Sequence, residues 1–355
     1  MSSEPLVSIC IPNYNYAQYL TRCFDSVLSQ TYDNIEVIFS DNNSTDDSFE
    51  IAIEYRKKFA SKNIYYNFSK NKFNVGSDQN TTICRNKATG KYLMYLSSDD
   101  ALKPSFIEKC VSIMEKYPNL SMVMTNRDEI DKNDHITKQP PFFNKSFICK
   151  GEDMAAIFML AGIAVPSQIL LRKSLIFESF KYNIGSFMIA GDWYANFKMA
   201  CVGQVGYLKE ALVEYRVHAQ NETNDSEKSL LGVFEHYQLL NTFVRIANMR
   251  KFKKPQARFL EGRAKLSSMC LRYAHKMLSL SEDDVARRYL AMAQVFDPEI
   301  CHHALYDKLH SCLSLAQEPR LALLAELNSS GVIRRSVSYD PPSEYTEINE
   351  EAQTC

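Results

Sequence analysis

The chain has 355 residues, of which 45% are hydrophobic, so it can form one large domain or two with sizeable cores. Its 41 Lys and Arg residues nearly balance its 42 Asp and Glu residues, which argues against nucleic acid as a partner and favours small anions. The ten cysteines include no C-x-x-C pair, which argues against a disulfide framework or a structural zinc and fits reduced thiols in a cytosol.

Strand-like and helix-like segments alternate along the N-terminal part of the chain. Leu6 to Ile11 is a compact apolar run, and helical spacing follows over Ala17 to Gln30. The same order then recurs, with further predicted strands at 35–39, 64–68 and 92–96 and further predicted helices at 47–59 and 78–88. Strands separated by helices favour an α/β fold with a Rossmann-like, mostly parallel sheet and right-handed crossovers.

Three more segments follow this block. Residues from about 145 to 222 contain predicted helices near 153–161 and 192–201 around short strands, and their motifs complete the first block. From about residue 226 to residue 327 the pattern is strongly helical. The last stretch, 336–355, has two consecutive prolines, several acids and little periodic apolarity, which predicts a disordered tail. We therefore expect one domain over 1–225, a helical accessory region over 226–330 and a disordered tail over 331–355.

Two adjacent carboxylates, Asp99 and Asp100, end the strand predicted at 92–96. Ligands of open α/β sheets bind beyond the carboxyl ends of the strands, so this pair is a candidate site for a divalent cation. The alternative is that the two acids only open a loop or cap a helix near Pro104. The loops after the first two strands should reach the same edge, where Tyr14 can stack on a nucleobase and Asp41 can accept a base or ribose proton.

Three segments resemble the signatures of family-2 glycosyltransferases in sequence, order and spacing. They are VSICIPNYNY from Val7, SDNNSTDDS from Ser40 and LSSDD from Leu96. The family has the GT-A fold, a single α/β nucleotide-sugar-binding domain, and transfers a sugar from a nucleotide diphosphate with inversion at the anomeric carbon. The resemblance covers about residues 5–222, and it implies a nucleotide-binding part over about 5–130 and an acceptor part over about 145–222. The helical pattern beyond them predicts a C-terminal helical extension.

The resemblance also implies roles for individual residues on the donor side. Asp99 matches the aspartate that coordinates the cation, Mg²⁺ or Mn²⁺. Asp100 matches the next residue of the motif, which faces the donor sugar or contacts the groups that coordinate the metal. The residues expected to bind the nucleotide sugar are Pro12, Tyr14, Asp41, Asn74, Gly76, Asn80, Ser98, Asp99, Asp100, Trp193 and Arg216.

The second block supplies the base that an inverting displacement needs. Gly191 to Tyr194 opens a helical stretch and resembles the family's acidic-Asp-Trp motif, whose aspartate is the usual base, so Asp192 is the expected general base. The alternatives are a helix N-cap for Asp192 and core packing for Trp193. Downstream, Glu214 to His218 resembles the family's Y-R-x-H segment, which implies that Arg216 binds the diphosphate and that His218 ligates the metal.

The chain departs from the family signatures in two places. Ser97 stands where the commoner signature has the first acid of Asp-x-Asp-Asp, and Asn42-Asn43 replace the usual Asp-Gly. Loss of that acid predicts weaker metal binding, or ribose recognition by Ser98 or Asp41 instead. The alternative function is therefore a non-catalytic nucleotide-sugar-binding protein with a degenerate metal motif.

The remaining features concern partners and location. Arg245 to Lys265 contains eight basic residues against Glu261 alone, which indicates either peripheral contact with the inner face of a membrane or a solvated helical face. The N-terminus lacks the basic and apolar regions of a signal peptide, so we expect a cytoplasmic protein. The expected partners are a nucleotide-diphosphate sugar, with uridine as the nucleoside, and a glycan or lipid-linked acceptor in polysaccharide biosynthesis.

Overall fold

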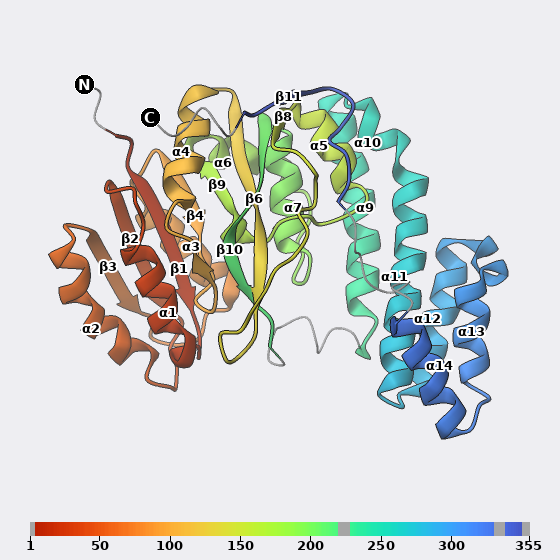
Figure 1. The fold of residues 1–355 in the computed structure, drawn as a ribbon. Helices are drawn as coiled ribbons and strands as arrows, with labels where there is room; N and C mark the ends of the chain where they lie inside the picture. The colour runs from red at the N-terminus through yellow and green to blue at the C-terminus, as the bar shows by residue number, and fades with distance from the viewer. Residues whose placement is uncertain (1–3, 219–227, 330–337, 350–355) are drawn as a thin grey trace.

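The computed structural model describes residues 4–218, 228–329 and 338–349. An 11-stranded mixed sheet forms the α/β part of the molecule, with the strand order β11-β8-β10-β6-β9-β4-β1-β2-β3 (Figure 1). Strands β1, β2, β3 and β4 pair in parallel, as do β6 and β10, whereas β9 runs antiparallel to both β4 and β6. The predicted α/β class with a mostly parallel core is therefore confirmed.

The strand and helix alternation of the N-terminal block agrees with the sequence pattern. The elements are β1 (Val7–Asn13), α1 (Ala17–Leu28), β2 (Ile35–Asp41), α2 (Ser48–Ser61), β3 (Tyr65–Lys70), α3 (Ser77–Lys87) and β4 (Tyr92–Tyr95). Both β1 and β2 are buried almost throughout, which explains why they read as continuous apolar runs. Their residues alternate between two hydrophobic cores, because successive side chains of a strand point to opposite faces of the sheet.

The second block adds the strands that extend this sheet. Its elements are β5 (Ala101–Leu102), α4 (Phe106–Lys116), β6 (Leu120–Ile130), β7 (Ile136–Thr137), β8 (Phe147–Cys149), α5 (Gly151–Phe158), β9 (Ile169–Arg172), α6 (Lys173–Ser179), α7 (Gly191–Ala200) and β10 (Gln204–Arg216), with short 3₁₀ turns at Pro166–Gln168 and Phe180–Tyr182. One core contains side chains of α1, α2 and α4, and the other contains side chains of α3, α5 and α7. The sheet therefore has helices on both faces.

The C-terminal region is helical, as predicted. It comprises α9 (Leu231–Arg250), α10 (Lys253–Ala257), α11 (Phe259–Ser279), α12 (Asp283–Phe296), a 3₁₀ turn at Pro298–His302, α13 (Ala304–Cys312) and α14 (Gln317–Ser329). Its apolar side chains join the same core cluster as α5 and α7, so the packing is continuous from the sheet into the helices. The expected domain boundary near residue 225 lies outside the described residues, and the division into domains stays a prediction.

The expectation of a disordered tail is wrong for residues 338–349. In this segment β11 (Tyr345–Glu347) pairs antiparallel with β8, and Ile348 is buried. Ion pairs of Glu344 with Lys150 and of Glu347 with Lys145 hold the strand against the α/β part. An edge strand such as β8 presents unpaired backbone groups, and the short tail satisfies them despite its polar composition.

The basic segment over Arg245 to Lys265 is divided among the end of α9, α10 and the start of α11. Pro255 lies within α10, which has only five residues. Lys251 and Lys253 are exposed, whereas Lys254 pairs with Asp153. Among the described helices, none is long and apolar enough to span a bilayer. Peripheral contact with a membrane stays a prediction.

Candidate active site

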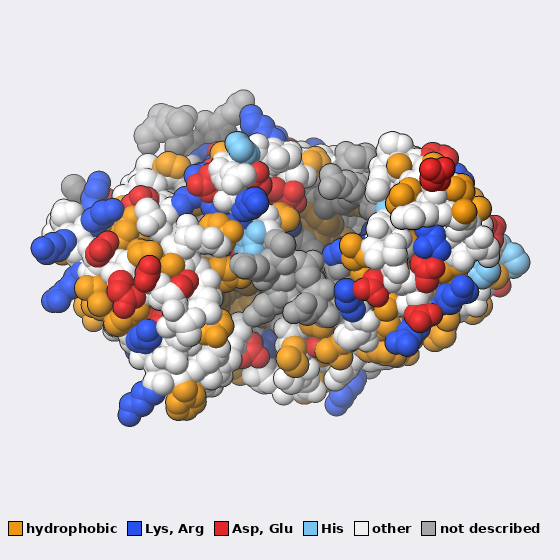
Figure 2. Space-filling view, turned by 90° about the horizontal axis from the view of Figure 1, so that it is seen from below, with side chains coloured by type: hydrophobic (Ala, Val, Ile, Leu, Met, Phe, Trp, Pro, Cys, Tyr) orange, Lys and Arg blue, Asp and Glu red, His pale blue; other side chains and the backbone are white. Residues whose placement is uncertain are grey.

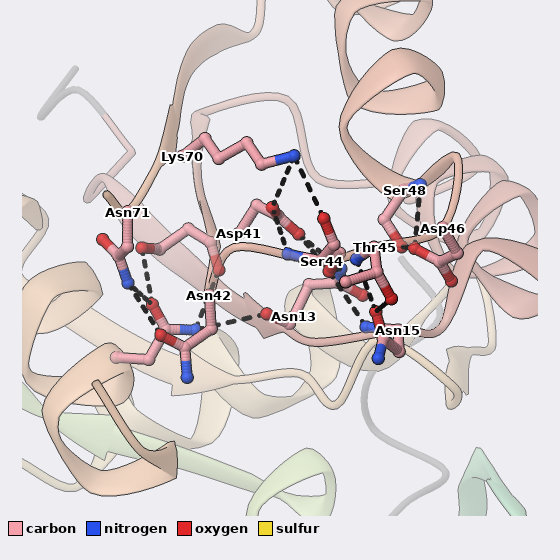
Figure 3. Close-up of polar contacts among 12 residues, drawn as sticks. Asn13, Asn15, Asp41, Asn42, Ser44, Thr45, Asp46, Ser48, Lys70 and Asn71 are labelled. Carbon is pink, nitrogen blue, oxygen red and sulfur yellow. Dashed lines mark hydrogen bonds and ion pairs between the residues drawn. The ribbon is translucent and has the colours of Figure 1, made fainter. Parts of the chain in front are cut away.

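The loops after β1 and β2 are joined by hydrogen bonds at the carboxyl edge of the sheet (Figure 3). The side-chain amide of Asn13 donates to Asp41 Oδ1 at 3.0 Å, and the backbone N–H of Ser44 donates to Asp41 Oδ2 at 3.0 Å. The ammonium of Lys70 lies 3.9 Å from Asp41 Oδ2. Asp41 is 0% exposed, and its side chain holds the two loops together, while its recognition of the base or ribose stays a prediction.

Asparagines connect the second loop to the third. The Asn42 amide donates to Asn74 Oδ1 at 2.8 Å, and Asn42 Oδ1 accepts from the backbone N–H of Val75 at 2.9 Å. Asn43 has φ +64°, a left-handed conformation that Asn tolerates and that the usual glycine adopts without strain. The Asn42-Asn43 replacement therefore has a structural reason, because it keeps the loop conformation and adds side-chain bonds to the next loop.

The donor-side residues separate into an exposed set and a buried set. Tyr14 is 42% exposed, and Asn74 and Gly76, in the loop between β3 and α3, are also exposed. Gly76 has φ +86° where α3 begins, so a side chain there would be strained. Asn80 and Ser98 are buried behind these loops, and Pro12 is half-buried.

Asp99 and His218 come together as the proposed metal ligands. His218 Nε2 lies 3.1 Å from Asp99 Oδ2, and the two side chains are only 4% and 13% exposed, respectively. The rings of Tyr16 and Tyr19 lie 5.6 and 5.3 Å from the imidazole and shield it. A carboxylate oxygen is the ligand type that Mg²⁺ and Mn²⁺ prefer, and an imidazole nitrogen is a ligand of transition metals, so the pair fits Mn²⁺ better than Mg²⁺. Within the described ranges, no cluster of three or more His, Cys, Asp or Glu side chains could hold a metal.

Asp100 is buried and bonded within the protein. The Ser167 hydroxyl donates to Asp100 Oδ2 at 2.6 Å, and the backbone N–H of Arg216 donates to Asp100 Oδ1 at 2.9 Å. Burial and the negative charge of Asp99 raise the pKa of the Asp100 carboxyl. These bonds connect the turn that carries Asp99 to Ser167 and to β10. Asp100 therefore holds the Asp99 turn in position.

Arg216 is bonded to the same turn and to the loop after β6. Its side chain is 1% exposed, its Nε donates to the Asp99 carbonyl at 2.8 Å, and its two terminal nitrogens bond to Asp131 and Asp134. The guanidinium also lies 4.3 Å from the ring centroid of Tyr19. In this structure the guanidinium fastens the turn that carries Asp99, and the binding of the diphosphate by Arg216 stays a prediction.

Asp192 lies in the first turn of α7. Its Oδ1 accepts from the Trp193 backbone N–H at 2.6 Å, while Ala190 occupies the N-cap position, so Asp192 is not the cap residue. Burial raises the pKa of the Asp192 carboxyl, and the Trp193 N–H and the charges of His236 and Arg127 oppose that rise. A carboxylate with a raised pKa is a better proton acceptor near neutral pH.

Trp193 packs between helices. Its indole N–H donates to the Phe158 carbonyl at 2.8 Å, and its ring lies 5.3 Å from His236 and 6.1 Å from Phe243 of α9. These contacts agree with the alternative interpretation of Trp193 as a core residue.

Arg127 is a site residue that the sequence analysis missed. It lies near the carboxyl end of β6, where Gln168 Oε1 accepts from its Nη1 at 3.1 Å and the Tyr215 ring lies 4.1 Å below its guanidinium. Its positive charge lowers the pKa of both Asp100 and Asp192. The sequence feature that could have identified Arg127 is a basic residue just after the largely apolar segment 120–125, but no strand was predicted there.

Figure 2 views the molecule from the side at which the parallel strands end, and the surface there is hollowed between the α/β part and the helical region. The loops after β1, β2, β4 and β10 meet at this edge through the contacts described above. This placement at the carboxyl ends of the strands is where open α/β sheets bind ligands.

Comparison with known proteins agrees with this geometry. Residues 8–180 match the family model for glycosyl transferase family 2. An uncharacterized glycosyltransferase of Rickettsia prowazekii (strain Madrid E) is 32% identical over 239 residues, which cover 66% of this chain and 70% of that protein. The fold is similar to residues 1–349 of S. aureus TarS crystallised with UDP-GlcNAc, with a TM-score of 0.56, 16% identity and 97% of each chain covered. It is also similar to the mannosyltransferase PcManGT from Pyrobaculum calidifontis in complex with GDP-Man and Mn²⁺, with a TM-score of 0.56, 15% identity and coverage of 94% of this chain and 82% of that chain.

The fold and the family match define a glycosyltransferase of GT-A architecture. The chain belongs to glycosyl transferase family 2.

Proposed function

We propose that the protein is an inverting, metal-assisted glycosyltransferase that moves a sugar from a UDP-sugar to a hydroxyl of a glycan or lipid-linked acceptor. The observation that carries this proposal is that Asp99 and His218, 3.1 Å apart, meet at the carboxyl edge of the sheet in a chain of glycosyl transferase family 2. The complexes of similarly folded enzymes with UDP-GlcNAc and with GDP-Man and Mn²⁺ support a nucleotide-sugar donor and a cation.

Asp99 and His218 would hold the cation, with the donor's phosphates and water completing its ligands. When bound, the cation neutralises the charge that develops on the departing diphosphate. Arg216 keeps the Asp99 turn in place through its bond to the Asp99 carbonyl, and Asp100 does the same through Ser167. Both are therefore positioning residues for the metal side.

Tyr14, Asn74 and Gly76 form the exposed edge on which the nucleotide lies, in this proposal. Tyr14 offers a ring face for stacking, and the backbone of Gly76 allows close approach of a ligand. Asp41 and Asn80 are buried, and their bonds to Asn13 and Ser40 hold the loops in place. Base recognition by Asp41 is thus proposed to be indirect.

Asp192 takes the proton from the acceptor hydroxyl as that oxygen attacks the anomeric carbon from the face opposite the diphosphate. One carboxylate is sufficient for this step, and a pKa raised by burial brings it closer to the working pH.

The decisive test is the Asp192→Asn variant, assayed with a panel of nucleotide sugars and acceptors and with Mg²⁺ or Mn²⁺. We expect kcat to fall by about 10²–10⁴-fold, the usual contribution of a general base, while stabilisation by UDP with Mn²⁺ in a thermal-shift assay is unchanged. A matched control is Asp284→Asn, which changes an exposed aspartate in the first turn of α12.

The competing function, a non-catalytic nucleotide-sugar-binding protein, is motivated by Ser97 in place of an acid. It would be supported if the parent bound a nucleotide sugar yet turned over none of the donors with any acceptor. Asp192→Asn activity equal to that of the parent would instead remove the base assignment alone.

A further inference from the structure

One buried carboxylate in the helical region contacts the segment that leads into α7. Glu235 of α9 is 8% exposed, and its two oxygens accept three successive backbone N–H groups. Met188 donates to Oε2 at 3.0 Å, and Ile189 and Ala190 donate to Oε1 at 2.6 and 2.7 Å. A carboxylate that accepts several backbone N–H groups forms strong, charge-assisted bonds.

The three donors directly precede Gly191 and Asp192. Ala190 stands at the N-cap position of α7 and has no side-chain oxygen to cap the helix. Glu235 supplies a carboxylate to this helix entry from a different helix, 45 to 47 residues away in sequence. Because each bond fixes one residue of the segment, together they determine where α7 begins and how its first turn is oriented.

Other contacts show that α9 packs along α7 beyond this cap. The rings of Phe243 and Phe197 are stacked with centroids 3.9 Å apart and an interplanar angle of 7°. His236 follows Glu235 and lies 5.3 Å from the ring of Trp193, the neighbour of Asp192. Helix α9 therefore contacts α7 both in its first turn, at Trp193, and one turn later, at Phe197.

We propose that Glu235 is a positioning residue for Asp192, so that helix α9 is a working part of the active site and not an independent accessory element. This inference rests on the proposed role of Asp192 as general base. Glu235 acts through the 188–190 segment and does not touch the substrate. A displacement of a base by about 1 Å can cost about 10²-fold in rate, so loss of the cap should lower kcat without changing donor binding.

The test uses the full chain and four variants: Glu235→Gln, Glu235→Asp, Asp192→Asn and the double variant Asp192→Asn with Glu235→Gln. Glutamine keeps the size of the side chain but offers only one acceptor oxygen, so we expect Glu235→Gln to lower kcat about 10- to 100-fold at an unchanged donor KM. Glu235→Asp keeps the charge and should recover part of kcat. Glu261→Gln, an exposed glutamate of α11, is the matched control and should behave like the parent.

The double variant separates positioning from a general structural effect. If Glu235 acts through Asp192, then Glu235→Gln should lower kcat no further once Asp192 is already Asn. An equal fold-loss in both backgrounds would overturn the proposal, and so would a parent-like kcat in Glu235→Gln. If both Glu235 variants lost donor binding and melted well below the parent, the residue's role would be structural and the proposal would again be wrong.

The result for Asp192→Asn alone distinguishes this inference from the proposed function. Retained activity there would overturn the base assignment and this inference with it. A large loss in Asp192→Asn together with a parent-like Glu235→Gln would overturn this inference alone.

Discussion

The two sides of the candidate site are built in different ways. On the donor side, Asn13, Asp41 and Asn42 bond to neighbouring loops within the first 80 residues, mostly through uncharged amides and hydroxyls. On the base side, Asp192 depends on β6 and on a helix of the C-terminal region. The donor side is therefore a local, self-contained structure, whereas the base side is assembled from segments that are far apart in sequence.

The comparison has a physical consequence. A local network of neutral hydrogen bonds mainly stabilises the fold of its loops, at about 0.5–1.5 kcal/mol for each bond. Charged groups brought together from distant segments, such as Asp99 with His218, affect the chemistry instead, because their energies depend on protonation and on bound ions. Changes on the donor side should thus lower stability first, and changes on the metal and base side should lower activity first.

After Asp192→Asn, the largest effect is expected for Asp99→Asn. This change removes one of the two proposed metal ligands but keeps the backbone carbonyl that Arg216 contacts. We expect the rate to fall about 10²–10³-fold, equivalent to several kcal/mol of lost transition-state stabilisation, and the dependence on Mn²⁺ to weaken. Steady-state rates over a Mn²⁺ titration measure both, with Asp78→Asn, an exposed aspartate of α3, as control. An unchanged Mn²⁺ titration would contradict the assignment of Asp99.

The second prediction concerns stability on the donor side. Asp41→Asn replaces one of the two buried carboxylate oxygens by an NH₂ group that cannot accept, so either the Asn13 amide or the Ser44 backbone N–H loses its acceptor. We expect the free energy of unfolding to fall by about 1–3 kcal/mol, measured by urea denaturation, because a buried donor loses its partner.

Ser44→Ala provides the companion measurement for Asp41→Asn. The two changes act on one shared contact, the bond from the Ser44 hydroxyl to Asp41 Oδ1, so their effects on the free energy of unfolding should be less than additive. Unchanged stability combined with a raised donor KM would show that Asp41 contacts the donor directly.

The sequence pattern predicted the strands of the donor side well, because this part of the molecule is locally constructed. The strand ends that carry Tyr14, Asp41 and Asp99 were placed correctly, because apolar runs that end in polar loops are visible in sequence. What these side chains contact was not visible. The burial of Asp41 and Arg216 results from partners in other loops, which no periodicity reveals.

The parts that the sequence did not predict all depend on long-range pairing. Strand β11 lacks periodic apolarity and forms because the edge of β8, nearly 200 residues earlier, is available to it. Glu235 resembles any polar residue of an amphipathic helix, and only the packing of α9 on α7 gives it three backbone partners.

A smaller effect is expected for the pH dependence of Arg127→Met. Asp192 must be ionised to act as a base, so the rate should fall as the pH drops through its raised pKa. Arg127 lowers that pKa, and its removal disfavours the ionised carboxylate further. The acidic limb of the kcat profile should therefore move to higher pH in Arg127→Met. Arg56→Met, on the exposed surface of α2, should leave the profile in place. An unmoved limb in Arg127→Met would contradict the proposed effect of the Arg127 charge on Asp192.

The smallest effect is expected for Ser97→Asp, which restores the acid of the commoner signature. Ser97 keeps its backbone bonds in this variant, because its N–H donates to Ser167 Oγ at 3.0 Å and its carbonyl accepts from the Asp100 N–H at 3.0 Å. An added carboxylate beside Asp99 should tighten Mn²⁺ binding a few-fold, since affinity rises with the charge of the ligand set, but it also adds repulsion that the cation must offset.

A Mn²⁺ titration of activity compares Ser97→Asp with Ser97→Asn, which has the same size and no charge. If Ser97→Asp binds Mn²⁺ no more tightly than Ser97→Asn, then Asp99 and His218 already suffice with the donor's phosphates, and the metal side of this enzyme is complete without the first acid.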